Sequence, residues 1–166
     1  MSERTIFIER RPGRPIHGYL TYVDNDYAFS FRPADPNQVR DLLGSSGPAS
    51  LNFGTVQVEV ALPDGRCLFA WGYSPRQGWR FADLAGLPAP EPGECYCIAE
   101  LVAGTGLRAA GAPTQVMFDH SLGQVAVLVE DSTPDWAVQI ADGVSLVASA
   151  AGAPVGVLFE LPDNRA

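Results

Sequence analysis

Apolar residues recur at every second position along much of the chain, which is the period of a β-strand. The pattern is strongest in two stretches, YAFSF and FAWGY, where each second residue is aromatic. Residues i, i+2 and i+4 share one face of a strand, so each stretch sends an aromatic row to one side of a sheet. These aromatic residues are Tyr27, Phe29, Phe31, Phe69, Trp71 and Tyr73.

The second row belongs to a predicted hairpin, TVQVEVALPDGRCLFAWGYS, with its turn at Asp64-Gly65. This dipeptide supplies the positive φ angles that a tight two-residue turn needs. The turn length sets the register, and a slip of one residue would move the aromatic row to the opposite face. The predicted pairs are Leu62–Cys67, Val60–Phe69, Val58–Trp71 and Val56–Tyr73.

Other turns predict further hairpins. A turn at Asn25-Asp26 gives the pairs Asp24–Tyr27, Tyr22–Phe29 and Leu20–Phe31. Near the carboxyl end, Asp142-Gly143 and Ala151-Gly152 mark two more turns. The second of these gives the pairs Ala148–Val155, Leu146–Val157 and Val144–Phe159. Each register gathers large apolar residues on one face, which favours a buried sheet face.

Two segments depart from this strand pattern. Asp35 before Pro36 is a helix start, and the run PNQVRDLL predicts a short helix over 36–43 that ends at Gly44. Residues 75–94 are rich in Pro and Gly. Because this segment carries apolar residues, we expect an ordered loop that holds Trp79, Phe81 and Leu84 against the body.

The sequence therefore predicts an all-β fold, mainly antiparallel, in which consecutive hairpins form a barrel or a sandwich with one short helix near 36–43. A chain of 166 residues lies in the size range of one domain, and we expect a single β domain over 1–166. A two-lobed arrangement divided near 86–94 is the alternative.

Charge limits the partners. The formal net charge is −8, which argues against nucleic acid, because a phosphate backbone requires a clustered basic surface. The small basic group Arg4, Arg10, Arg11 and Arg14 stands in an otherwise acidic chain. The charge favours a basic protein partner, and homo-oligomerisation stays open.

The location is expected to be cytoplasmic, because the first residues contain no apolar stretch long enough for a signal peptide. No membrane span is expected, since the apolar run 144–161 is interrupted by Gly152, Pro154 and Gly156. Without export, the three Cys are expected to be reduced thiols.

The carboxyl-terminal segment 116–161 resembles a small bacterial family of uncharacterised β-meander domains. The matching pieces are Phe118-Asp119, Val125 to Val129, Ala141-Asp142-Gly143-Val144 and Pro154-Val155-Gly156-Val157. The chain departs from the family pattern at Gln124, near the position of a second acid. The resemblance implies a β-meander and no particular activity.

Candidates for catalysis are few. His17 and His120 could each serve as a general base in a pocket, since imidazole titrates near neutral pH. Glu100 interrupts the apolar strand CYCIAELV, where an unpaired buried acid would be costly. We expect Cys67, Cys95 and Cys97 to be buried, inert thiols and no metal or cofactor to be bound. The chain contains no nucleotide-binding, zinc-protease or nucleophile-elbow motif.

The aromatic rows have two interpretations. The first is a hydrophobic core, which Phe, Tyr and Trp commonly dominate. The second is a ligand site, because several of these rings carry a polar group and small ligands are held in concave, mostly apolar sites. The candidate ligand-binding residues are Tyr22, Tyr27, Phe29, Phe31, Phe69, Trp71 and Tyr73.

Two functional hypotheses follow. The first is a small acidic binding protein that acts on a protein partner or a hydrophobic small molecule, with immunity-type inhibitors of basic proteins as an analogy. The second is a cofactor-free barrel enzyme, such as a cyclase or isomerase, that holds a hydrophobic substrate in an aromatic-lined cavity. In the enzyme, a Tyr, His17 or Glu100 would polarise the substrate.

Overall fold

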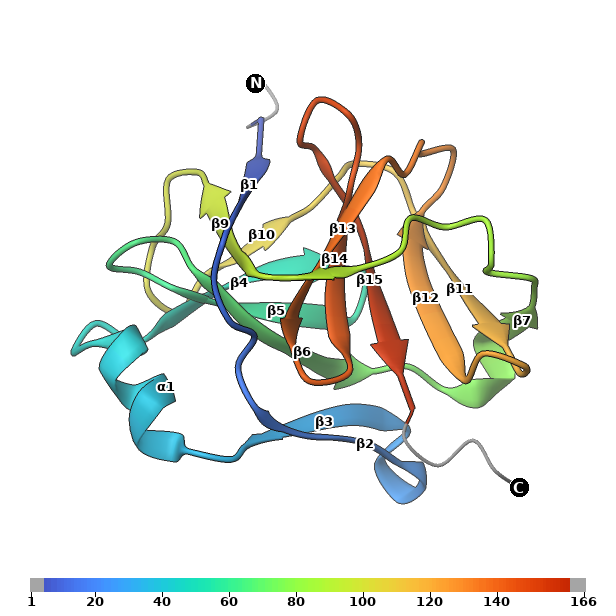
Figure 1. Cartoon of the computed structure of the whole chain (residues 1–166), viewed down its shortest axis with the longest axis horizontal. Helices are drawn as coiled ribbons and strands as arrows, with labels where there is room; N and C mark the ends of the chain where they lie inside the picture. The colour runs from blue at the N-terminus through green and yellow to red at the C-terminus, as the bar shows by residue number, and fades with distance from the viewer. Residues whose placement is uncertain (1–4, 162–166) are drawn as a thin grey trace.

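A computed structural model describes residues 5–161 and contains two large β-sheets with a small third sheet between them (Figure 1). In spatial order, the six-stranded sheet contains β10 (Gly106–Arg108), β4 (Pro48–Phe53), β5 (Val56–Ala61), β6 (Cys67–Tyr73), β3 (Ala28–Pro33) and β2 (Gly18–Val23). The seven-stranded sheet contains β7 (Trp79–Phe81), β11 (Thr114–Asp119), β12 (Gln124–Val129), β15 (Pro154–Glu160), β14 (Val144–Ala148), β13 (Trp136–Ala141) and β8 (Glu91–Pro92). The small sheet pairs β1 (Phe7–Arg11) with β9 (Glu94–Ile98).

The prediction of a mainly antiparallel β fold is confirmed: of residues 5–161, 52% are strand and 9% helical. The sheets are not closed into a barrel, so the barrel alternative is wrong. The order of strands explains this, because each large sheet ends in two free edges, β10 and β2 in one and β7 and β8 in the other.

The main core lies between the two large sheets. The rings of Phe29 in β3 and Phe159 in β15 stack with centroids 3.9 Å apart, and both side chains are almost fully buried. Valines from both sheets, such as Val58 and Val127, complete this core. The buried cluster thus contains residues from both sides of the segment 86–94.

A strap of residues 82–90 covers the other face of the seven-stranded sheet, and Figure 1 shows it crossing that sheet. Leu84 is buried there against Leu128 and Leu158. The prediction that this loop packs on the body is confirmed for Leu84 and for the half-buried Trp79. It is wrong for Phe81, which ends the three-residue edge strand β7 and is 83% exposed.

The register of β2 and β3 is as predicted, with Tyr22 opposite Phe29 and Leu20 opposite Phe31. The three-residue 3-10 helix η1 (Asp24–Asp26) forms the turn between these strands.

The predicted register of β5 and β6 is wrong. The main chains of Ala61 and Arg66 are hydrogen-bonded, so the turn contains four residues instead of two, and the register shifts again between Val58 and Val60. The observed pairs are Val60–Cys67, Val58–Ala70, Gln57–Trp71 and Val56–Gly72. As a result Leu68 and Ala70 face the core, and Trp71 and Tyr73 face solvent.

The carboxyl-terminal hairpins are largely as predicted. Ala141 faces Val144 across the Asp142-Gly143 turn. The pairs Val144–Phe159 and Leu146–Val157 are confirmed, whereas Ala148 lies opposite Pro154 instead of Val155, because the register shifts after Val147.

The helix α1 (Pro36–Leu43) has the predicted bounds. The Asn37 N–H donates to Asp35 Oδ1 at 3.0 Å, which satisfies one of the free donors at the helix start. Val39 is buried, and Leu42 and Leu43 pack against the core. Within residues 5–161, no helix is long and apolar enough to cross a membrane.

The three cysteines are buried and unpaired, as predicted. A hydrogen bond with Cys95, together with burial, raises the pKa of Cys67 well above its ordinary value, and burial raises the pKa of Cys97 to about 11. Neutral, inaccessible thiols react slowly. We expect Ellman's reagent to leave the native protein unmodified and to label all three thiols after unfolding in guanidinium. A thiol that reacts rapidly in the native protein would contradict this placement.

Candidate functional site

The structure divides the seven predicted ligand-binding aromatics into two groups. One group packs inside the protein: Tyr22, Phe29, Phe31 and Phe69. The other lies on the outer surface of the six-stranded sheet: Tyr27, Trp71 and Tyr73. The predicted single aromatic surface therefore does not exist, because the register of β6 turns Trp71 and Tyr73 outward.

The inner group belongs to an aromatic cluster in the core. Tyr22 packs edge-on against Phe29 and Trp79, each at 5.1 Å between centroids. The Tyr22 hydroxyl donates to the Ser74 carbonyl at 2.7 Å, and burial raises the Tyr22 pKa. Phe31 stacks on Phe69 at 5.0 Å. These rings are packed against one another, which is the core interpretation of the rows.

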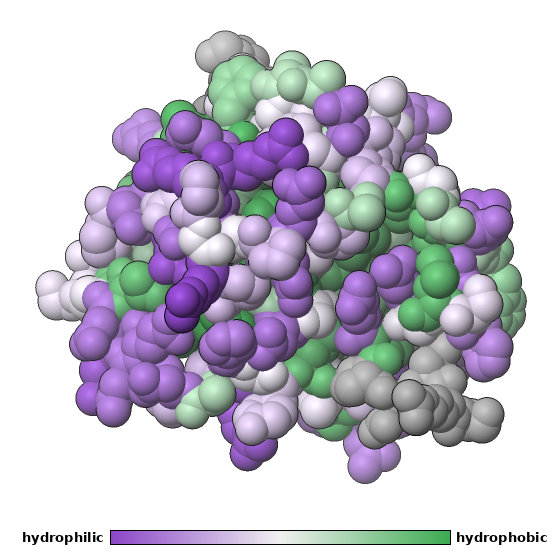
Figure 2. Space-filling view, in the orientation of Figure 1, coloured by the Kyte–Doolittle hydropathy of each residue, from purple (hydrophilic) through white to green (hydrophobic). Residues whose placement is uncertain are grey.

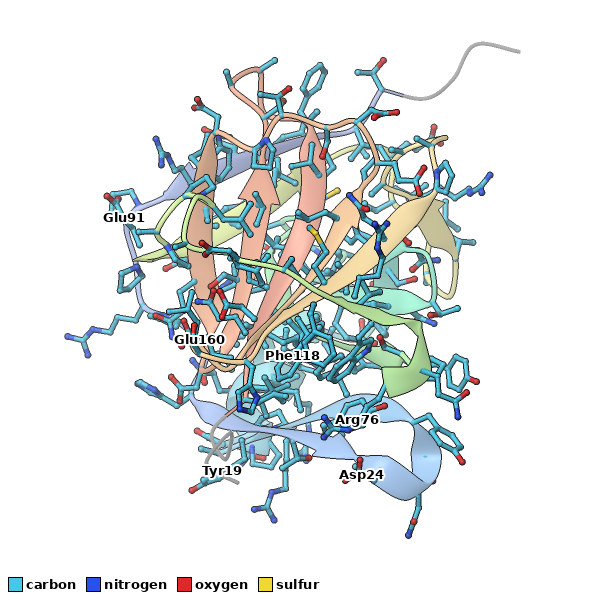
Figure 3. The ribbon with its side chains drawn as sticks, turned by 90° about the vertical axis from the view of Figure 1, so that its right-hand side faces the viewer. Tyr19, Asp24, Arg76, Glu91, Phe118 and Glu160 are labelled. Atoms are coloured by element: carbon cyan, nitrogen blue, oxygen red, sulfur yellow. The ribbon has the colours of Figure 1, made fainter. Side chains whose placement is uncertain are left out.

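A guanidinium closes this cluster at the surface. The Arg76 guanidinium lies 4.5 Å from the ring centroid of Tyr22 and 5.0 Å from that of Trp79. It also forms an ion pair with Asp24 at 2.9 Å. Figure 3 shows Arg76 between Phe118 and Asp24, beside the β2–β3 hairpin. The cation–π contacts shield the cluster from water at this end.

The outer group forms a surface that we call the aromatic face: Tyr19, Tyr27, Trp71 and Tyr73. Their exposed fractions are 57%, 51%, 38% and 52%, respectively. Tyr19 comes from β2 and Tyr27 follows η1, while Trp71 and Tyr73 come from β6. Small side chains of the sheet lie among them: Ala28 pairs with Tyr73, and Ser30 pairs with Thr21.

Local contacts orient the rings of the aromatic face. The Trp71 indole N–H donates to Glu59 Oε1 at 2.9 Å. The Arg32 guanidinium lies 5.0 Å from the Tyr19 ring centroid. These contacts hold Trp71 and Tyr19 before any partner arrives, which lowers the entropy lost on binding.

Gly72 allows the aromatic face to form. It lies between Trp71 and Tyr73 with φ of +139°, and its Cα faces the carbonyl of Thr55 so closely that a Cβ would overlap that oxygen. The Thr55 hydroxyl also donates to the Tyr73 carbonyl. Only glycine fits this close approach of β6 to the β4–β5 turn.

The three catalytic candidates lie on separate connections of the fold. His17 precedes β2 and its Nδ1 lies 3.2 Å from Asp142 Oδ2, with the imidazole largely exposed. His120 lies in the β11–β12 turn beside Phe118, next to an open groove of about 550 Å³. Glu100 follows β9 and is exposed, so no cost of burial arises for this acid. CYCIAELV leaves the sheet after Ile98, and Glu100 reaches solvent.

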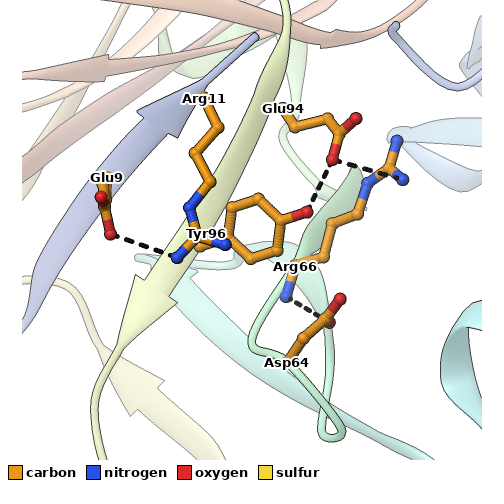
Figure 4. Close-up of polar contacts among 6 residues, drawn as sticks. All are labelled: Glu9, Arg11, Asp64, Arg66, Glu94 and Tyr96. Atoms are coloured by element: carbon orange, nitrogen blue, oxygen red, sulfur yellow. Dashed lines mark hydrogen bonds and ion pairs between the residues drawn. The ribbon is translucent and has the colours of Figure 1, made fainter. Parts of the chain in front are cut away.

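A second polar cluster joins the small sheet to the β5–β6 turn (Figure 4). Glu94 Oε1 accepts a hydrogen bond from the Tyr96 hydroxyl at 2.6 Å and lies 3.8 Å from Arg66. The hydrogen bond to Glu94 raises the pKa of Tyr96. The Arg11 guanidinium lies 4.0 Å from the centroid of the Tyr96 ring. The contacts of this cluster join β1, β9 and the β5–β6 turn, so we interpret the cluster as structural.

Figure 2 shows strongly hydrophilic side chains over β1 and the segment that follows it. In the predicted basic group, Arg10 contacts the Trp136 ring and Arg11 pairs with Glu9, whereas Arg4 lies outside the described residues. In the part of the chain that the structure describes, no group of three or more His, Cys, Asp or Glu side chains is placed to hold a metal ion.

Asp119 attaches the strap to β11. It accepts hydrogen bonds from the N–H groups of Leu84, Ser121 and Leu122 and from the Ser121 hydroxyl. These bonds, led by the one from Leu84, lower the Asp119 pKa below its ordinary value of 3.8. The sequence showed this acid only as part of the β-meander pattern.

We expect the Asp119 carboxylate to make stability pH-dependent. Because its pKa is lower in the folded than in the unfolded protein, its contribution is present above the unfolded value of 3.8 and is lost as the pH falls through the folded value. Asp119→Asn should therefore lower the urea midpoint at neutral pH, and the difference from the wild type should shrink as the pH falls below 3.8. A difference that does not change with pH would contradict this role.

Comparisons with known proteins add no assignment: no protein-family model matches the chain, and no curated protein resembles it significantly. The resemblance of residues 116–161 to β-meander domains stays a prediction. Function must therefore be argued from the geometry of the aromatic face.

Proposed function

We propose that this chain is a β-sandwich binding domain that docks a basic protein partner through the aromatic face. The observation that carries the proposal is the outward orientation of Trp71 and Tyr73, which leaves two large aromatic side chains 38% and 52% exposed on a regular sheet. Burial of such side chains in an interface is favourable, because it removes their apolar surface from water.

The composition of the surface favours a protein over a small molecule as the partner. Tyr, Trp and Arg are the residues most enriched at binding hot spots, and small polar residues between them adapt to the partner by hydrogen bonding. The aromatic face has this composition, with Thr21 and Ser30 between the rings and Arg32 beside them. It presents an exposed sheet surface, which suits another protein surface.

Charge favours a basic partner. The net charge is −8, and the exposed Asp26 directly precedes Tyr27 of the aromatic face. Complementary charge accelerates encounter and selects partners. An immunity-type inhibitor of a basic toxin is one example of this class, by analogy only.

The proposal can be tested with the purified products of the genes adjacent to the gene for this chain. We expect one of them to bind the immobilised protein, with affinity that falls as salt rises. Trp71→Ala and Tyr73→Ala should each weaken binding by about tenfold or more. Phe81→Ala, which removes an exposed ring away from the aromatic face, is the matched control and should leave binding unchanged. Binding that survives both face substitutions would overturn the proposal.

The enzyme alternative stays untested, and its structural basis is weaker because the sheets form no barrel. One observation favours a small-molecule function. A cavity of about 160 Å³ near β4 and β11 is lined by Asn52, Arg108 and Thr114, and within residues 5–161 the buried Asn52 Oδ1 has no hydrogen-bond partner. A small ligand there would raise the melting temperature of the wild type and not of Asn52→Leu.

A further inference from the structure

The free edge of β2 differs from the other edges of the large sheets. β10 and β7 contain three residues each, and β8 contains two, one of which is Pro92. Short strands and proline are devices that protect an edge from pairing with another chain. β2 contains six residues, Gly18–Val23, without charge, proline or a register shift against β3. Figure 1 shows β2 at the lower margin of the molecule.

The register shows which main-chain N–H and C=O groups of β2 point away from β3. The His17 carbonyl accepts a hydrogen bond from the Ala34 N–H, so alternate residues from His17 onward bond to β3. Gly18, Leu20 and Tyr22 therefore direct their N–H and C=O groups away from β3. The Gly18 N–H donates to Asp142 Oδ2 at 3.1 Å. Within residues 5–161, Leu20 and Tyr22 have no main-chain partner on this side.

A sheet edge with unpaired main-chain N–H and C=O groups can pair with an additional strand. An antiparallel copy of β2 supplies the complementary C=O and N–H groups. The strand is uncharged, so self-pairing brings no like charges together along its length. Its exposed positions are Tyr19 and Thr21, whose side chains can pack across a seam between two copies.

The charges at the ends of β2 are complementary under antiparallel self-pairing. His17 is paired with Asp142, and Asp24 with Arg76. Two charges remain without an ion pair in the described chain: Arg32, which extends over Tyr19 at the amino end, and Asp26, in the turn at the carboxyl end. When the β2 strands of two copies lie antiparallel, Arg32 of one copy comes toward Asp26 of the other.

We propose that two copies of this chain associate through β2, antiparallel and around a two-fold axis, to form one continuous sheet. The axis is perpendicular to the sheet, so both aromatic faces lie on the same side. The partner copy thus extends the aromatic face. The association itself does not depend on the proposed function, since it requires no other protein.

The test is sedimentation equilibrium of the purified protein up to about 1 mM, the range of weak interfaces. We expect a reversible dimer. Thr21→Lys should weaken it by at least about tenfold, because a lysine on an exposed edge strand prevents pairing. Ser30→Lys is the matched control, since Ser30 faces the same side one strand further in, and it should leave the dimer intact.

Two further measurements locate the interface. Amide exchange at Leu20 and Tyr22 should slow as the protein concentration rises, whereas Asp26→Arg should weaken the dimer about fivefold and Asp26→Arg with Arg32→Asp should restore it. A wild type that stays monomeric at about 1 mM, equal effects of Thr21→Lys and Ser30→Lys, or unchanged exchange at Leu20 would overturn the proposal.

Discussion

Replacing Phe29 with alanine is expected to lower the free energy of unfolding by about 3 to 5 kcal/mol, the range for a fully buried phenylalanine. Phe29 is 1% exposed and its ring stacks on Phe159 and Trp79. Its removal would leave a cavity where the two large sheets meet. The loss is measured by urea unfolding followed by circular dichroism.

Phe81→Ala is the control for this prediction, because it removes the same side chain from a position that is 83% exposed. Its expected effect is within about 0.5 kcal/mol. Similar losses for Phe29→Ala and Phe81→Ala would show that the stacked rings between the sheets are not the main core.

Gly72→Ala is expected to destabilise the protein by at least about 2 kcal/mol. The methyl group would overlap the Thr55 carbonyl oxygen, and alanine is strained at a φ of +139°. Because Gly72 lies between Trp71 and Tyr73, the substitution should also disturb the aromatic face. Thermal unfolding measures the loss of stability, and the tryptophan fluorescence, to which Trp71 contributes with Trp79 and Trp136, reports on the surroundings of these rings.

Gly78→Ala provides the comparison for Gly72, because nothing lies within 4 Å of a Cβ built there. It should leave stability nearly unchanged or raise it slightly, since alanine restricts the unfolded chain. A stable Gly72→Ala protein would contradict the close approach of β6 to the β4–β5 turn.

The hairpin β2–β3 could be predicted because one face of its alternating pattern was clearly more apolar. The hairpin β5–β6 could not, since LFAWGY has apolar residues on both faces: Leu68 and Ala70 alternate with Phe69 and Trp71. Only the hydrogen bond between Ala61 and Arg66 and the register shift near Val58 decide which set is inside. No residue type in the sequence predicts either of these two features.

The same ambiguity explains what could be predicted of the candidate site. The residue types predicted that Tyr27, Trp71 and Tyr73 belong to a binding site. They did not predict that these side chains point outward. Tyr19 was missed because it is a single aromatic residue outside both rows. The alternation of β2 contained a signal for it, since Leu20 and Tyr22 facing inward place Tyr19 outward.

The most direct test of the aromatic face is radical footprinting of the protein alone and in complex with its bound partner. We expect Tyr19, Tyr27, Trp71 and Tyr73 to lose reactivity in the complex, because the partner covers them, while Phe81 reacts as in the free protein. Protection of Phe81 together with unchanged reactivity of Trp71 and Tyr73 would contradict this expectation.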